Sequence, residues 1–129
     1  MHFLGRRPYE QLPAYCKAFD VGLIPFKVNR LTEAVNPIKL REYLAAGLPV
    51  VSTPMPEVKL YNHLIEVVDT AEGFVRAVEA ALASGPDARA LRTAAMALET
   101  WLGKMDQICR HLSASVGFPQ KGAAYETVA

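Results

Sequence analysis

The sequence predicts an α/β fold, namely a partial Rossmann-like parallel sheet of about four strands with flanking helices. Short apolar runs, of the kind found in strands buried on both faces, alternate with segments whose apolar residues recur at helical spacing. Prolines, glycines and capping residues separate these segments. The chain has 129 residues, the length of one domain, and the alternation favours a sheet with helices on its faces.

The first elements are expected in the N-terminal quarter of the chain. Residues 2–5 are predicted to form a short strand, and Pro8 is predicted to begin a helix with an apolar face. The continuous apolar run 21–26 predicts a strand buried on both faces. Residues 27–35 then form a loop at the carboxyl end of that strand, which is where open parallel sheets bind ligands.

Residues 36–47 have the pattern of a capped helix. Asn36 is a suitable N-cap, Pro37 suits the first helical position, and Gly47 supplies the left-handed residue that ends a helix. The exposed amides at such a helix start attract anions. Glu42 lies one turn further on, where its carboxylate is within reach of the hydroxyls of a ribose.

The next segments are shorter and end in a helix with an N-terminal capping signal. A strand, a short helix and a second strand are expected at residues 49–52, 57–63 and 65–68. Asp69 and Glu72 have the spacing of a capping box and predict a helix over residues 70–84. The residues predicted to face inward from this helix are Phe74, Val75, Val78, Ala81 and Leu82.

A long final helix is expected after the Ser-Gly-Pro segment that precedes residue 87. Asp87 is predicted to cap this helix, which reaches about Leu112, and Trp101 is predicted to be a packing anchor within it. Residues 1–112 are therefore expected to form one domain. Residues 113–129 lack periodicity and are predicted to be a flexible tail.

The composition excludes several classes of protein. A net charge of +1 gives no reason to expect a nucleic-acid partner. No apolar run approaches the roughly 20 residues that cross a bilayer, and the N-terminus is not a signal peptide, so a cytoplasmic protein is expected. Cys16 and Cys109 are then expected to be buried, reduced thiols. The histidines share no spacing with one another or with other ligands, so no metal site is expected. The absence of a Gly-rich dinucleotide fingerprint and of a Walker loop disfavours dehydrogenases and ATPases.

The helix at 36–47 and the strand after it carry a resemblance to a known family. Glu42, Gly47, Pro49, Val50 and Val51 form a Glu-x4-Gly-x-Pro-Val-Val pattern. This pattern closely resembles the donor-binding signature in the C-terminal domain of GT-B glycosyltransferases of the retaining, Glu-x7-Glu type. Upstream segments resemble the strand, helix and strand that precede the signature in that family. These segments are His2–Gly5, Leu12–Tyr15 and Ala18–Phe26. The resemblance covers roughly residues 2–112.

The resemblance implies the class of reaction and the first binding residue. Such enzymes transfer a hexosyl group from a nucleotide sugar to a glycan or a lipid-linked acceptor, without a metal ion or any cofactor besides the donor substrate. By this resemblance Glu42 accepts hydrogen bonds from the two hydroxyls of the donor ribose. Taken alone, Glu42 would be interpreted as a surface glutamate that the helix dipole stabilises, and the surrounding signature favours ribose binding instead.

Further donor contacts are implied at the helix start and in the loop before it. The backbone groups of the helix start are implied to face the diphosphate or the donor sugar, whatever the side chains are. The residues concerned are Asn36, Pro37, Ile38, Lys39 and Leu40. Lys39 could add a point charge to a phosphate or be a solvated surface lysine. The first glutamate of the family motif maps onto Ala34, which leaves the sugar contact open. Glu33 could replace it if the loop shifts by one residue, and Phe26 and Arg30 are candidate contacts to the base or phosphate.

The resemblance also leaves alternatives to a complete enzyme. The family plan has six strands in this domain and a preceding acceptor domain, so this chain is expected to be truncated at its N-terminal side and inactive alone. A missing acceptor domain, or a second copy, could dock on the exposed edge of its sheet. The complete enzyme could lie peripherally at the inner face of a membrane. The alternative is a non-catalytic remnant or interaction module that binds nucleotide weakly. A small flavodoxin-like or receiver domain is disfavoured, since Arg6-Arg7-Pro8 offers neither an acidic cluster nor a phosphate loop.

Overall fold

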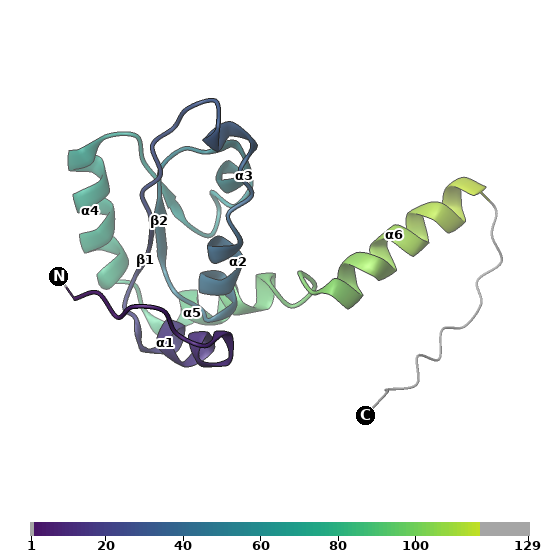
Figure 1. Ribbon diagram of the computed structural model, residues 1–129, viewed down its shortest axis with the longest axis horizontal. Helices are drawn as coiled ribbons and strands as arrows, with labels where there is room; N and C mark the ends of the chain where they lie inside the picture. The colour runs from purple at the N-terminus through teal and green to yellow at the C-terminus, as the bar shows by residue number, and fades with distance from the viewer. Residues whose placement is uncertain (1, 117–129) are drawn as a thin grey trace. The chain divides into compact units, whose positions relative to one another are not determined.

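The computed structural model describes residues 2–116 of the chain, and these divide into two compact units between Ala97 and Leu98. The first unit contains a three-stranded parallel sheet in the order β1-β2-β3. The strands are β1 (Gly22–Ile24), β2 (Val50–Ser52) and β3 (Glu66–Val67). This sheet confirms the predicted α/β fold with flanking helices (Figure 1).

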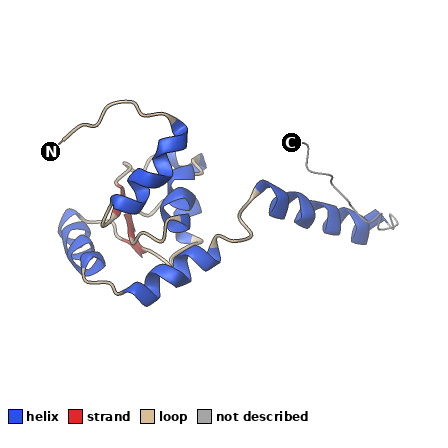
Figure 2. Cartoon of the chain, turned by 90° about the horizontal axis from the view of Figure 1, so that it is seen from below, coloured by secondary structure: helices blue, strands red, loops and turns tan. Residues whose placement is uncertain are grey.

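The helices of the first unit surround this sheet, as Figure 2 shows. In chain order they are η1 (Tyr9–Gln11), α1 (Leu12–Ala18), η2 (Thr32–Ala34), α2 (Ile38–Ala45), α3 (Pro56–Lys59), α4 (Ala71–Leu82) and α5 (Pro86–Ala95). The second unit contains α6 (Trp101–Val116). None of the described helices is long and apolar enough to cross a membrane.

The two faces of the sheet bury separate apolar clusters. Val50 points to the face covered by α2, where Leu40 and Leu44 are fully buried. The next residue, Val51, points to the opposite face and packs against Ala77 of α4. This alternation follows from the two-residue period of a strand. Burial on both faces was predicted for the run 21–26, but in β1 Leu23 remains 44% exposed. That prediction is therefore wrong for β1, because no described element covers its second face at Leu23.

The strand predicted at residues 2–5 is wrong. These residues are irregular and exposed, and Phe3 retains 89% of its accessible surface. Gly5 has a φ of 68°, which does not continue an extended strand. A strand needs a neighbour for its backbone hydrogen bonds, and the described sheet has its three strands elsewhere. The predicted count of about four strands is therefore one too many for the described residues.

Helix α2 ends as predicted but begins one residue later than expected. Gly47 has a φ of 78°, and the amides of Gly47 and Leu48 donate to the carbonyls of Leu44 and Tyr43, each at 2.9 Å. This is the Schellman arrangement that glycine favours. At the other end the N-cap is Pro37, with an extended backbone and no side-chain cap bond. The prediction that Asn36 is the N-cap is wrong, and its side-chain oxygen instead accepts a hydrogen bond from Arg41.

Helix α4 is capped by Thr70 and not by the predicted Asp69. The Thr70 hydroxyl accepts a hydrogen bond from the amide of Gly73 at 3.1 Å. The inward residues are Phe74, Ala77, Val78 and Ala81. Val75 and Leu82 remain 59% and 58% exposed, so their predicted inward position is wrong. The four inward positions follow i, i+3, i+4 and i+7 spacing, and both exposed residues lie one position beyond that stripe.

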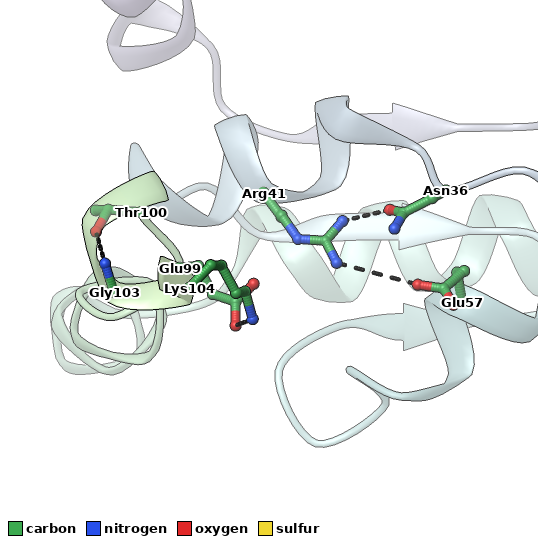
Figure 3. A network of polar contacts seen from close by, with 7 residues as sticks. All are labelled: Asn36, Arg41, Glu57, Glu99, Thr100, Gly103 and Lys104. Carbon is green, nitrogen blue, oxygen red and sulfur yellow. Dashed lines mark hydrogen bonds and ion pairs between the residues drawn. The ribbon is translucent and has the colours of Figure 1, made fainter. Parts of the chain in front are cut away.

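The long helix predicted from residue 87 to about Leu112 is two helices. Helix α5 has Met96 as its C-cap, and α6 begins only at Trp101. The Thr100 hydroxyl accepts a hydrogen bond from the Gly103 amide at 3.0 Å, an interaction typical of an N-cap (Figure 3). Lys104 pairs with Glu99 at 2.6 Å across the same helix start. A new helix start therefore interrupts the predicted segment.

Helix α6 changes three further expectations. Trp101 is 88% exposed, so it is not a packing anchor among the described residues. Cys109 is exposed, contrary to prediction, whereas Cys16 is buried as predicted. The helix continues to Val116, so residues 113–116 of the predicted tail are helical. The rest of that predicted tail, residues 117–129, lies outside the described residues.

Candidate functional site

The loop between β1 and α2 lies at the carboxyl end of the sheet, where its first residues are fixed to the strand beside it. The amide of Thr53, the residue after β2, donates to the carbonyl of Ile24 at 3.2 Å. The Thr53 hydroxyl donates to the carbonyl of Phe26 at 2.7 Å. Phe26 is therefore positioned by a neighbouring strand end, and its side chain is 41% exposed.

The middle of this loop is held by its own polar side chains. The side-chain oxygen of Asn29 accepts hydrogen bonds from the amides of Leu31 and Thr32 at 2.9 and 3.1 Å. The Thr32 hydroxyl donates to the carbonyl of Lys27 at 2.8 Å. These bonds fix the short 3-10 turn η2. Arg30 and Glu33 have exposed side chains on this ordered turn.

The start of α2 presents some of its predicted contact residues to solvent and buries others. Asn36, Ile38 and Lys39 are exposed, whereas Pro37 and Leu40 are buried. The Leu40 side chain is a core residue, and its amide donates to the Pro37 carbonyl at 3.0 Å. The first amides of a helix have no carbonyl partner within the helix and carry its positive dipole end. The amides suited to an anion are thus those of Ile38 and Lys39.

Glu42 is partly buried and lines a pocket of about 250 Å³ between α1 and α2. The other lining residues are Tyr9, Leu12, Pro13, Cys16, Lys17, Ala45 and Ala46. Glu42 and Lys17 are the charged groups of a wall that is otherwise mainly apolar. A carboxylate offers two acceptor oxygens, so this pocket suits a ligand that combines neighbouring hydroxyls with an apolar ring.

Two neighbouring groups respond to the Glu42 carboxylate. Burial raises the pKa of the Cys16 thiol, and the negative charge of Glu42 raises it further. Burial likewise raises the pKa of the Tyr43 hydroxyl, with further contributions from Cys16 and Glu42. Both groups are therefore held in their neutral forms beside Glu42.

The structure separates the predicted site residues into three groups. Glu42 lies in the pocket between the two helices, while the helix-start residues belong to the preceding turn of α2. The residues that line the pocket do not include the loop candidates Phe26, Arg30 and Glu33. Within residues 2–116 no three His, Cys, Asp or Glu side chains are grouped so that they could hold a metal ion.

Arg41 is a residue of this region that the sequence did not single out. One guanidinium nitrogen donates to the side-chain oxygen of Asn36, and another lies 4.0 Å from a carboxylate oxygen of Glu57 (Figure 3). The guanidinium carbon also lies 5.5 Å from the centre of the Tyr61 ring. No local pattern predicts the contacts with Glu57 and Tyr61, because both residues lie far along the chain from Arg41. The apolar spacing of α1 was visible, but not that it faces Glu42.

A large part of the chain is similar in sequence to known glycosyltransferases. A sequence model of the family described as "Glycosyl transferases group 1" matches residues 1–84. The chain is also 35% identical over 82 residues to the Bacillus subtilis (strain 168) protein named "Putative teichuronic acid biosynthesis glycosyltransferase TuaH". That match covers 60% of this chain and 21% of the relative, so the chain spans about a fifth of the relative's length. No solved structure matched the chain significantly.

Proposed function

Because the chain belongs to the group 1 glycosyl transferases, we propose that residues 1–84 bind the nucleoside diphosphate of a sugar donor. The complete reaction is the transfer of a hexosyl group from a nucleotide sugar to a glycan or a lipid-linked acceptor. The name of the TuaH relative includes teichuronic acid biosynthesis, which supports a polysaccharide as the product class.

The pocket that Glu42 lines is the observation that carries this proposal. Its carboxylate accepts hydrogen bonds from the two ribose hydroxyls, because two adjacent hydroxyl donors match two carboxylate oxygens. The base lies against the apolar wall that includes Tyr9 and Leu12. The position of Glu42 one turn into α2 supports this role, since the diphosphate then extends from the ribose toward the helix start.

The start of α2 binds the diphosphate in this proposal. The amides of Ile38 and Lys39 provide donors at the positive end of the helix dipole. Lys39, whose side chain is exposed, adds a positive charge, and Asn36 precedes the helix on the incoming segment. Pro37 and Leu40 contribute through the buried positions that fix this turn. These groups stabilise the departing diphosphate without a metal ion.

The donor sugar is assigned to the loop before α2. Ala34 stands where the motif described above has its first glutamate, so the sugar contact falls to Glu33 on the ordered loop. Phe26 and Arg30 on the same loop are the candidates to contact the base or a phosphate. The chain spans about a fifth of the TuaH relative, and the acceptor is bound by another part of a complete enzyme. The outer edge of β1, which ends the described sheet, is a further place for a partner strand or a second copy.

Titration of the purified chain with UDP, GDP and dTDP, followed by calorimetry or amide NMR, tests the proposal. We expect saturable binding of one nucleotide. Glu42→Ala and Glu42→Gln should weaken it at least about tenfold, because hydrogen bonds to a charged group contribute about 1.5–3 kcal/mol. Glu79→Ala, on the exposed face of α4, is the matched control and should bind like the wild type. A folded wild type that binds none of the three nucleotides would contradict the proposal. Glu42 variants that bind the nucleotide as tightly as the wild type would contradict it as well.

A further inference from the structure

We propose that Arg41 is a positioning residue for the donor diphosphate. It holds the segment Asn36–Pro37 against α3 and thereby fixes the direction of the Ile38 and Lys39 amides. The inference rests on the proposed function of the helix start and adds a residue that does not itself touch the donor.

Arg41 joins three elements of the first unit through one planar group. It belongs to α2, its guanidinium donates to Asn36 in the incoming loop, and it lies 4.0 Å from Glu57 of α3. Its guanidinium carbon also lies 5.5 Å from the centre of the Tyr61 ring. Figure 3 shows the guanidinium between Asn36 and Glu57, with one nitrogen directed to each. A planar, forked cation can make these contacts together, whereas an ammonium group cannot.

The start of α2 depends on this contact because it lacks the usual support. Its N-cap is Pro37, which has no side-chain oxygen, and the structure gives this cap no side-chain hydrogen bond. Asn36, the residue suited to capping, uses its side-chain oxygen to accept from Arg41. The conformation of Asn36 is therefore set by Arg41 rather than by the helix amides. Those amides stay available to an anion instead of being occupied by an Asn36 cap.

The same contacts make Arg41 a poor direct ligand for phosphate. Its side chain is only 27% exposed, and its guanidinium is already directed to Asn36, Glu57 and the Tyr61 ring. To reach a phosphate it would have to leave these partners. Its positive charge nonetheless remains close to the helix start, where it adds to the dipole. The expected effect of Arg41 is thus on the diphosphate and not on the base or ribose.

The test compares a nucleoside with its diphosphate on the full chain. For the nucleotide that the wild type binds, Arg41→Ala should lower the affinity for the nucleoside diphosphate about tenfold. It should lower the affinity for the free nucleoside by less than about twofold. Arg41→Lys keeps the charge but not the forked guanidinium, so its affinity for the diphosphate should lie between those of the wild type and Arg41→Ala. Arg76→Ala, an exposed arginine of α4, is the matched control and should change neither affinity. Hydrogen exchange without ligand should be faster in Arg41→Ala at the amide of Leu40, which donates to the Pro37 carbonyl in this turn.

The outcomes separate this inference from the proposed function. Equal weakening of nucleoside and diphosphate would mean a general structural role and would overturn the inference. Unchanged diphosphate binding and unchanged exchange in both Arg41 variants would overturn it as well, while Glu42-dependent binding left the proposed function standing. A folded wild type that binds no nucleotide would overturn both. If Arg41→Ala does not fold, the diphosphate-selective loss must appear in Arg41→Lys.

Discussion

The ring of Tyr43 lies directly on the backbone of Gly22. A methyl group added at Gly22 would stand 2.5 Å from Cδ2 of that ring and 2.8 Å from Cγ, which is closer than carbon atoms can approach. The contact brings α2 against β1 at a position without a side chain. Glu42, the residue proposed to bind ribose, is the neighbour of Tyr43 in α2. The close approach of the helix to the strand therefore also fixes the position of Glu42.

Gly22→Ala is expected to destabilise the protein by about 1–3 kcal/mol, because overpacking forces the Tyr43 ring and its helix to move. The reduced freedom of the unfolded chain offsets only about 0.4–1 kcal/mol of this. Urea unfolding of Gly22→Ala, Tyr43→Ala and the double variant measures the effect. The double variant should be less destabilised than the sum of the single changes, since removal of the ring relieves the clash. Strict additivity would show that the clash is absent.

Arg92 connects α5 to the end of α2, which leads to a second prediction. This arginine is 9% exposed, and one of its guanidinium nitrogens donates to the carbonyl of Gly47 at 3.3 Å. Burial lowers the pKa of Arg92, and the charge of Arg89 lowers it further, but a guanidinium still stays protonated at neutral pH. Its charge is favourable at the negative end of the α2 dipole.

Arg92→Met should therefore lower the free energy of unfolding by about 1–3 kcal/mol, since it leaves the Gly47 carbonyl without this donor. Thermal or urea unfolding measures the loss. Arg76→Met on the exposed face of α4 is the control, and its stability should stay within about 0.5 kcal/mol of the wild type. An equal effect of both substitutions would mean that the contact with Gly47 contributes nothing specific.

The sequence predicted those parts of the fold that local signals determine. The end of α2 and the strand after it follow from Gly47 and the apolar run behind Pro49, because a left-handed residue and a buried strand are local properties. The strand expected at residues 2–5 failed because a strand also requires a neighbour, which no local pattern supplies. The break before α6 was missed because the apolar spacing continues through it without a proline or glycine. Only Thr100 marks the start of the new helix.

The candidate site was predictable to the same extent. Glu42 and the start of α2 were visible in a contiguous segment, and both remain the basis of the proposed donor site. The contact of Arg41 with Glu57 and the wall that α1 contributes to the pocket join residues that are distant in sequence. Such contacts are set by tertiary packing, so no local pattern in a single sequence predicts them. The burial of the Leu40 side chain likewise depends on tertiary packing.

The cap of α4 provides a prediction that separates two adjacent residues. Thr70→Ala should destabilise the protein by about 0.5–2 kcal/mol, because the amide of Gly73 loses its hydrogen-bond acceptor. Asp69→Ala is the matched control, as its side chain is exposed and Thr70 is the cap that the structure gives. Urea unfolding of both variants distinguishes them. A larger loss in Asp69→Ala than in Thr70→Ala would restore the capping box expected from the sequence.

The two cysteines are expected to react with a thiol reagent in separate phases. Cys109 is exposed, whereas Cys16 is buried and its pKa is raised by burial and by Glu42. At pH 8 the thiolate fraction of Cys16 is therefore smaller than that of an ordinary thiol, and its reaction should be at least about tenfold slower. Reaction with a chromogenic disulfide measures both rates. Cys109→Ser should remove the fast phase, and loss of the slow phase instead would contradict the assignment.

The slow thiol also reports on the pocket and on alkaline stability. Because Cys16 and Glu42 line the same pocket, a bound nucleotide should slow the Cys16 reaction further, and Glu42→Ala should abolish this protection.

The raised pKa of Cys16 means that the thiol keeps its proton in the folded state at a pH where the unfolded chain, with a thiol pKa of about 8.5, releases it. The stabilisation is thus complete below that pH and is lost as the pH rises through the folded pKa. Urea unfolding between neutral and alkaline pH should show a smaller decline for Cys16→Ala than for the wild type. An equal decline in the two proteins would show that another group governs the alkaline loss.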